Sequence, residues 1–160
     1  MSAKPLHVTV TANAESPTKL AVSVRDFAFV IDEPPSYGGT DAGPNPVEYL
    51  LASLAGCMNV VIHMIAQERG VEVRALHLTV KGELDPSRLM GQPTENRTGF
   101  QSIELIADID SDASPADLEE ILHLSELRCP VSDNVGAETP IAIRLATAAD
   151  EDARAVAHHR

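Results

Sequence analysis

A run of 17 residues without a formal charge, Leu50 to Ala66, constrains the fold of this chain more than any other feature. It follows a strong helix start, because Asn45 is a good N-cap and Pro46 suits the first helical position. Glu48 can return a hydrogen bond to the Asn45 amide, and Gly70 is a suitable terminator. Helices that are apolar on every side are usually enclosed by other elements. We therefore expect a central helix surrounded by sheet, in part from a second subunit.

Alternating apolar residues predict antiparallel strands before and after this helix in the sequence. A shift of phase near Asp26 indicates a turn or bulge, and Ser114 begins a second helix with Pro115 at its first position and Asp117 in a capping box. These patterns predict an α+β fold with one domain over 1–147 and a frayed tail over 148–160. The expected strands lie at 7–12, 20–24, 27–31, 76–80, 103–109 and 141–145.

The composition excludes several classes of partner. With 24 acidic and 12 basic side chains, the net charge of −12 repels phosphate backbones and anionic membrane surfaces. The uncharged run spans about 25 Å as a helix, slightly short for a membrane span. We expect no nucleic-acid or membrane partner. The N-terminus already alternates like a strand, so we expect no secretory signal and a cytoplasmic location.

Two cysteines are the candidate reactive groups. Cys57 lies within the uncharged helix, and Cys129 precedes a proline, which favours the end of one helix and the start of another. That position would place the Cys129 sulfur near backbone N–H groups, whereas burial alone would raise the pKa of Cys57. The residues themselves leave two interpretations open: a dithiol redox site, or two buried small hydrophobes.

A metal site is not predicted, because no pair of cysteines and histidines has the short spacing typical of zinc ligands. His63 lies six residues after Cys57, about 240° around the helix, so the two side chains do not share a face. We expect His63 to be a satisfied interior histidine.

Three motifs together resemble those of the OsmC/Ohr family of thiol-dependent peroxidases: GGTDAGPNPVEYLLASLAGC, GFQSIEL and RCPVSDNV. The family places one cysteine in a buried helix that begins at an N-P or S-P step, and a second in a C-P-x-S motif roughly seventy residues later. Cys57 and Cys129 match both positions, and the order of elements agrees over 7–147. The long loop between Asp32 and Pro46 resembles that of the OsmC-like branch.

This resemblance implies an intertwined homodimer, with sheets of both chains wrapped around the central helices and two sites at the interface. Cys57 would be the peroxidatic thiolate and Cys129 the resolving thiol. The thiolate would reduce an organic hydroperoxide, and the resulting sulfenic acid would condense with the second thiol to a disulfide. A lipoyl-type or small dithiol would be the reductant, and no cofactor is implied.

Two further residues complete the expected site. Arg25 is our candidate for the cation that activates Cys57, with Arg97 and Arg128 as alternatives. The peroxidase branch has a glutamate directly after the N-P step, but Val47 occupies that position here and the acid is Glu48. Glu48 is therefore either a catalytic residue or only a helix cap. The principal alternative function is a non-catalytic dimer that binds an apolar small molecule in the cleft near Cys57.

Overall fold

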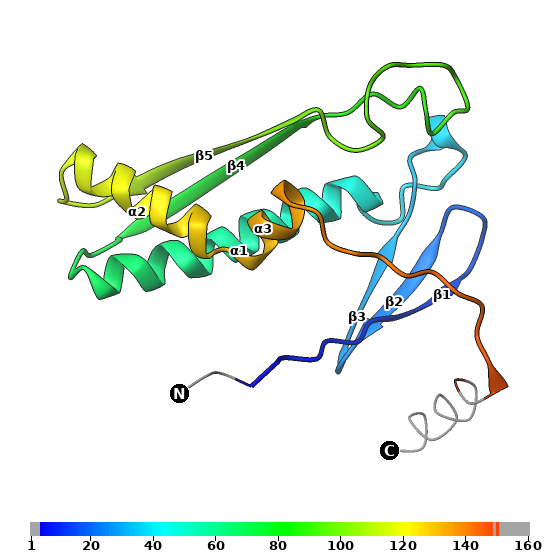
Figure 1. Ribbon diagram of the computed structural model, residues 1–160, viewed down its shortest axis with the longest axis horizontal. Coiled ribbons are helices and arrows are strands. Elements are labelled where there is room, and N and C mark those ends of the chain that lie inside the picture. The colour runs from blue at the N-terminus through cyan, green and yellow to red at the C-terminus, as the bar shows by residue number, and fades with distance from the viewer. Residues whose placement is uncertain (1–3, 149, 151–160) are drawn as a thin grey trace.

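The structure, a computed structural model, describes residues 4–148 and 150 and has an α+β architecture (Figure 1). Its helices and strands follow the predicted order, with a short 3-10 helix, η1, in the Pro-rich loop. The elements are β1 (Thr11–Ala14), β2 (Leu20–Val24), β3 (Phe27–Ile31), η1 (Pro35–Tyr37), α1 (Pro46–Glu68), β4 (Ala75–Glu83), β5 (Ser102–Asp110), α2 (Pro115–Arg128) and α3 (Pro130–Gly136).

The strands form two antiparallel sheets. One has the order β1-β2-β3, and the other is the long β4-β5 hairpin. Figure 1 shows β4-β5 on one side of α1, with α2 and α3 beside that helix and the three-stranded sheet at its N-terminal end. The Tyr49 hydroxyl donates to the Val30 carbonyl oxygen (2.9 Å), and the Tyr49 ring lies 5.1 Å from that of Phe29. These contacts fix the first turn of α1 against β3.

The hydrophobic core lies along one face of α1. Six residues of that face pack with Ile121 of α2 and with Cys129, and the inward-facing residues of β4 and β5 close the cluster. Apolar burial of this kind is the main stabilising contribution to such a fold. The buried residues of α1 are Leu54, Met58, Val61, Ile62, Ile65 and Ala66.

The opposite face of α1 is exposed within one chain, so the expected cover on that side by a second subunit stays a prediction. Val60 on this face is 63% exposed. His63 is also on this face and is not an interior histidine, although its Nδ1 lies 2.8 Å from the Asn59 carbonyl oxygen. The other exposed residues there include Ala52, Ser53, Gly56 and Met64. Coverage of this face would have to come from outside the chain.

Among the described residues, α1 is the one helix that is long and apolar enough to cross a membrane by length and composition. A third of its most apolar stretch is buried inside the protein (33%). A core helix passes the same test, so the finding is weak evidence for a membrane span.

The predicted helix ends are mostly confirmed. The Asn45 side chain accepts from the Glu48 amide (2.9 Å), and the Glu48 carboxylate accepts from the Asn45 amide (2.8 Å). Gly70 follows α1 with a left-handed φ of 68°. At α2 the Ser114 side chain accepts from the Asp117 amide as expected, but the reciprocal bond differs. The Asp117 carboxylate accepts from the Ser114 hydroxyl, because its shorter side chain replaces glutamate in the box.

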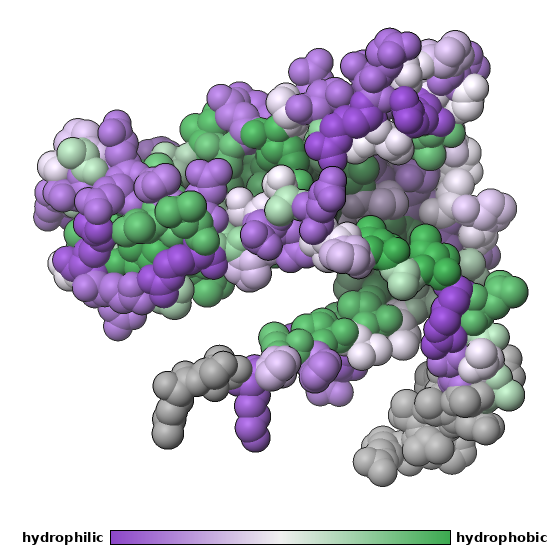
Figure 2. Space-filling view, in the orientation of Figure 1, coloured by the Kyte–Doolittle hydropathy of each residue, from purple (hydrophilic) through white to green (hydrophobic). Residues whose placement is uncertain are grey.

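Two predicted strands are wrong within one chain. The first begins only at Thr11, and the segment 138–147 contains no strand. Both segments keep alternating apolar residues, but Val8 is 71% exposed and Ile143 is 93% exposed. Figure 1 shows both segments running outside the helical body, and Figure 2 shows hydrophobic surface along the N-terminal one. A strand needs a hydrogen-bonding neighbour, and one chain offers none to these segments.

Candidate active site

The fold brings the two cysteines together although they are far apart in the sequence. Cys57 comes from the middle of α1, and Cys129 lies between α2 and α3. The two thiols are free and lie near enough for Cys129 to influence the pKa of Cys57. Cys57 is half-buried, whereas Cys129 is 1% exposed. An external reagent would therefore reach the Cys57 sulfur first.

The Cys129-Pro130 step produces this geometry. Proline disfavours the helical conformation of the preceding residue, and Cys129 has an extended backbone with φ −82° and ψ 111°. Cys129 thus ends α2 and also caps α3, as predicted. Its sulfur accepts the Ser132 amide N–H (3.3 Å), and the Val131 amide is near enough to Cys57 to lower the pKa of that thiol. The first turn of α3 therefore lies beside both cysteines.

The electrostatics of Cys57 favour the neutral thiol within one chain. Burial raises the pKa of Cys57 above its ordinary value, and the neighbouring Cys129 thiol raises it further. The Val131 amide opposes this shift, because an N–H donor stabilises the thiolate. No cation of the described residues is among the groups that shift this pKa. A reactive thiolate would need a cation from outside the described chain.

The structure does not bring Arg25 to Cys57 within one chain. Arg25 lies in the turn between β2 and β3 with a left-handed φ of 52°, and its guanidinium group lies 5.0 Å from the Phe27 ring centroid. Figure 1 shows this turn at the end of the three-stranded sheet that lies away from α1. Glu48 serves in the capping box, more than two turns before Cys57. The catalytic roles of Arg25 and Glu48 stay predictions.

The alternative arginines have other contacts in this chain. Arg128 forms a two-bonded ion pair with Glu68 at the end of α1 (2.6 and 3.0 Å), which holds α2 against α1. That pairing lowers the pKa of Glu68. Arg97 lies in the segment between β4 and β5, with its guanidinium beside Gly99. Neither side chain has a hydrogen bond or ion pair with Cys57 among the described residues.

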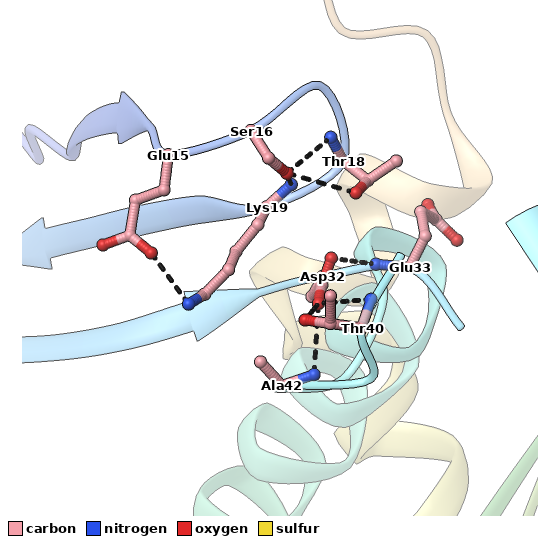
Figure 3. A network of polar contacts seen from close by, with 8 residues as sticks. All are labelled: Glu15, Ser16, Thr18, Lys19, Asp32, Glu33, Thr40 and Ala42. Carbon is pink, nitrogen blue, oxygen red and sulfur yellow. Dashed lines mark hydrogen bonds and ion pairs between the residues drawn. The ribbon is translucent and has the colours of Figure 1, made fainter. Parts of the chain in front are cut away.

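One buried carboxylate was missed from the sequence. Asp32 is fully buried and accepts from the Glu33 amide (2.9 Å), the Thr40 amide and hydroxyl (3.0 and 2.6 Å) and the Ala42 amide (3.1 Å), as Figure 3 shows. These donors hold the pKa of Asp32 well below its usual range. A Cβ at Gly39 would overlap the Glu33 carbonyl, so the loop that precedes α1 is tightly folded. An acidic residue directly before a Gly/Pro-rich loop was the available signal.

An apolar cavity of about 410 Å³ lies next to the cysteine pair. Its walls include Leu54 and Met58, which flank Cys57 on α1, and Ser132 of α3, whose amide donates to Cys129. Cys57 and Cys129 do not line this cavity, so it adjoins the dithiol rather than containing it. The remaining lining residues are Ile103, Leu105, Leu122, His123, Glu126, Val135 and Gly136.

No group of three or more histidine, cysteine and carboxylate side chains within 4–148 and 150 could hold a metal ion. The chemical capacity of the site thus lies in its two thiols and in the two amides of α3. A pair of thiols in this arrangement can pass between the dithiol and disulfide states.

Comparison with known proteins identifies the fold. A family model described as OsmC-like protein matches residues 39–144, which is more than half of the chain. No curated protein matches the sequence. Solved structures match over most of their length, and an OsmC-like protein from Mycoplasma pneumoniae superposes with a TM-score of 0.72 at 21% identity, covering 84% of this chain and 90% of that one.

Two other structures are comparable. An OsmC-like protein of unknown function from Vibrio cholerae has a TM-score of 0.69 at 14% identity and covers 84% of this chain and 96% of that one. An organic hydroperoxide resistance protein from Legionella pneumophila has a TM-score of 0.63 at 22% identity, with 82% and 91% covered. At these identities the likeness establishes the fold.

Proposed function

The chain belongs to the OsmC-like protein family, and from this premise we propose that it is a cysteine-dependent peroxidase that reduces organic hydroperoxides. The observation that carries the proposal is the pair of free thiols, Cys57 and Cys129, which the fold brings close together beside the first turn of α3. The similarity to proteins described as organic hydroperoxide resistance proteins supports the substrate class.

In the proposed reaction, the Cys57 thiolate attacks the terminal peroxide oxygen and the O–O bond breaks. The alkoxide leaves and takes a proton to become the alcohol, so the peroxide is reduced and Cys57 becomes a sulfenic acid. The Cys129 thiol then attacks the Cys57 sulfur, forming the disulfide and releasing water. A lipoyl-type or small dithiol reduces that disulfide and is itself oxidised to a cyclic or linear disulfide.

We further propose that the working unit is an intertwined homodimer. The uncharged exposed face of α1 and the two exposed alternating segments, 5–10 and 138–147, support this assembly. A second copy would cover the helix face and offer neighbours to both segments. It would also be the source of the cation that Cys57 lacks within one chain, for which Arg25 is the candidate.

The proposal is tested with a steady-state assay of organic hydroperoxide consumption in the presence of a dithiol. Cys57→Ser should abolish turnover. Cys129→Ser should also lose turnover but should still accumulate a sulfenic acid on Cys57 that a trapping reagent detects. Trapping on Cys129 in Cys57→Ser, with turnover retained, would exchange the two roles. Undiminished turnover in both variants would refute the proposal.

The alternative function, a dimer that binds an apolar small molecule without catalysis, is favoured by one observation. The cavity beside the cysteines is mostly apolar and is large enough for a small ligand. Binding of such a ligand without any loss of thiols on addition of peroxide would support this alternative.

A further inference from the structure

We propose that the cavity between β5, α2 and α3 binds the apolar body of a neutral or cationic small molecule and discriminates against carboxylates. Any consequence of this selectivity for catalysis rests on the proposed peroxidase function. Binding of the ligand uses neither thiol and does not depend on that function.

The shape of the cavity suits an apolar chain. Leu54 and Met58 of α1, Ile103 and Leu105 of β5 and Leu122 of α2 form its apolar walls. Figure 2 shows hydrophobic surface between the β4-β5 hairpin and the α2–α3 region. A volume of about 410 Å³ is within the usual range of small-molecule sites.

Charge at the rim determines which head group is accepted. The polar side chains at the rim are those of His123, Glu126 and Ser132, and no lysine or arginine lines the cavity. Within the described residues, neither the Glu126 carboxylate nor the His123 ring has a side-chain hydrogen bond or ion pair. The Glu126 carboxylate is therefore available to a cationic or hydrogen-bond-donating head group, and it repels an anionic one.

The position of the cavity links this selectivity to the dithiol. Leu54 and Met58 lie on either side of Cys57 in the sequence of α1, and Ser132 bonds the Cys129 sulfur. A ligand held there contacts residues that neighbour the two cysteines. If the cavity receives the peroxide or the reductant, neutral hydroperoxides and amide-linked dithiols are preferred to free acids of the same length.

The test uses Nile red, a neutral dye that fluoresces in apolar sites, with the full chain at pH 7.5. Bound dye is displaced by decanol, decylamine or decanoate, which share one chain length and differ in charge. We expect decanol and decylamine to displace the dye at concentrations at least about tenfold lower than decanoate. The Cys57→Ser protein should give the same result, which separates this test from that of the peroxidase function.

Two charge-reversal variants of α2 form a matched pair. Glu126→Lys should bring the displacing concentration of decanoate down to that of decanol. Glu119→Lys, which changes the same net charge about two turns away and outside the cavity, should leave the order of competitors unchanged. The proposal is overturned if Nile red does not bind, if decanoate competes as well as decanol in the unmodified protein, or if the two variants behave alike.

Discussion

A peroxidatic cysteine reacts as a thiolate, yet burial and the neighbouring Cys129 thiol raise the pKa of Cys57 in the single chain. The Val131 amide of α3 partly offsets this shift. Activation has to come from a positive charge that approaches Cys57 from outside α1.

The contribution of Cys129 to the state of Cys57 can be measured directly. Because the neighbouring Cys129 thiol raises the pKa of Cys57, Cys129→Ala should lower that pKa. Alkylation of Cys57 by iodoacetamide should then rise at lower pH than in the unmodified protein, with Cys57→Ser giving the background. A pH profile that stays in place or moves to higher pH would show that Cys129 does not raise the pKa of Cys57.

The parts of the site that depend on local sequence, namely the two cysteines and the helix break at Pro130, could be predicted. Cys57, Cys129 and Pro130 in the sequence indicated two thiols and a break between helices. In the structure Cys129 lies at that break, and its sulfur accepts the Ser132 amide of α3. The burial of Asp32 was not predictable, because its four hydrogen-bond donors come from residues of an irregular loop. The sequence shows no periodic pattern there from which the path of the backbone could be inferred.

Among the elements, the loop 33–43 folds around the Asp32 carboxylate and leads directly into α1. The stability of this loop should therefore depend on pH. The low pKa of Asp32 means that its contribution is fully present above the ordinary carboxyl pKa of about 4 and is lost as the pH falls further.

Asp32→Asn should lower the melting temperature at pH 7, because the new amide N–H group meets backbone donors. The variant should also lose part of the fall in melting temperature that the unmodified protein shows between pH 5 and pH 3. Differential scanning calorimetry measures both effects. Asp26→Asn, at an exposed position of the β2–β3 turn, is the control. Equal behaviour of the two variants would contradict the role of Asp32.

The elements that were predicted wrongly share a physical cause. The sequence at 141–145 alternates like a strand, but a strand forms only when its backbone hydrogen-bonds to a neighbouring strand. Among the described residues this segment has no such neighbour. The helices were predicted more successfully because their caps and hydrogen bonds are local, as at Asn45 and Ser114.

At the scale of the whole molecule, the exposed apolar residues of 5–10 and 138–147 and the bare face of α1 have one economical explanation, a second copy. We predict a dimer at micromolar concentration by sedimentation velocity. Gly56→Arg should shift it toward monomer, because Gly56 lies on the bare face and has open space around it in one chain. A well-folded monomer of the unmodified protein would remove the basis for an interface site.

Dimerisation would also determine whether Arg25 can act. If the Arg25 of a second copy approaches Cys57, Arg25→Ala should raise the pKa of Cys57 and slow its reaction with an organic hydroperoxide at least about tenfold, equivalent to about 1.4 kcal/mol. Stopped-flow kinetics across pH gives both quantities, and Arg88→Ala is the control for loss of a surface arginine. An unchanged pH–rate profile in Arg25→Ala would show that Arg25 does not activate Cys57. Arg97 and Arg128 would then be tested.

If Cys57 and Cys129 form a catalytic dithiol, a peroxide must convert both thiols to one internal disulfide, which intact-protein mass spectrometry with thiol counting detects. Reduced protein receives one equivalent of cumene hydroperoxide without any reductant. We predict loss of both thiols, a mass decrease of about 2 Da per chain, and no covalent link between chains, as expected for an internal disulfide. Retention of both thiols, or a disulfide that joins two chains, would contradict it.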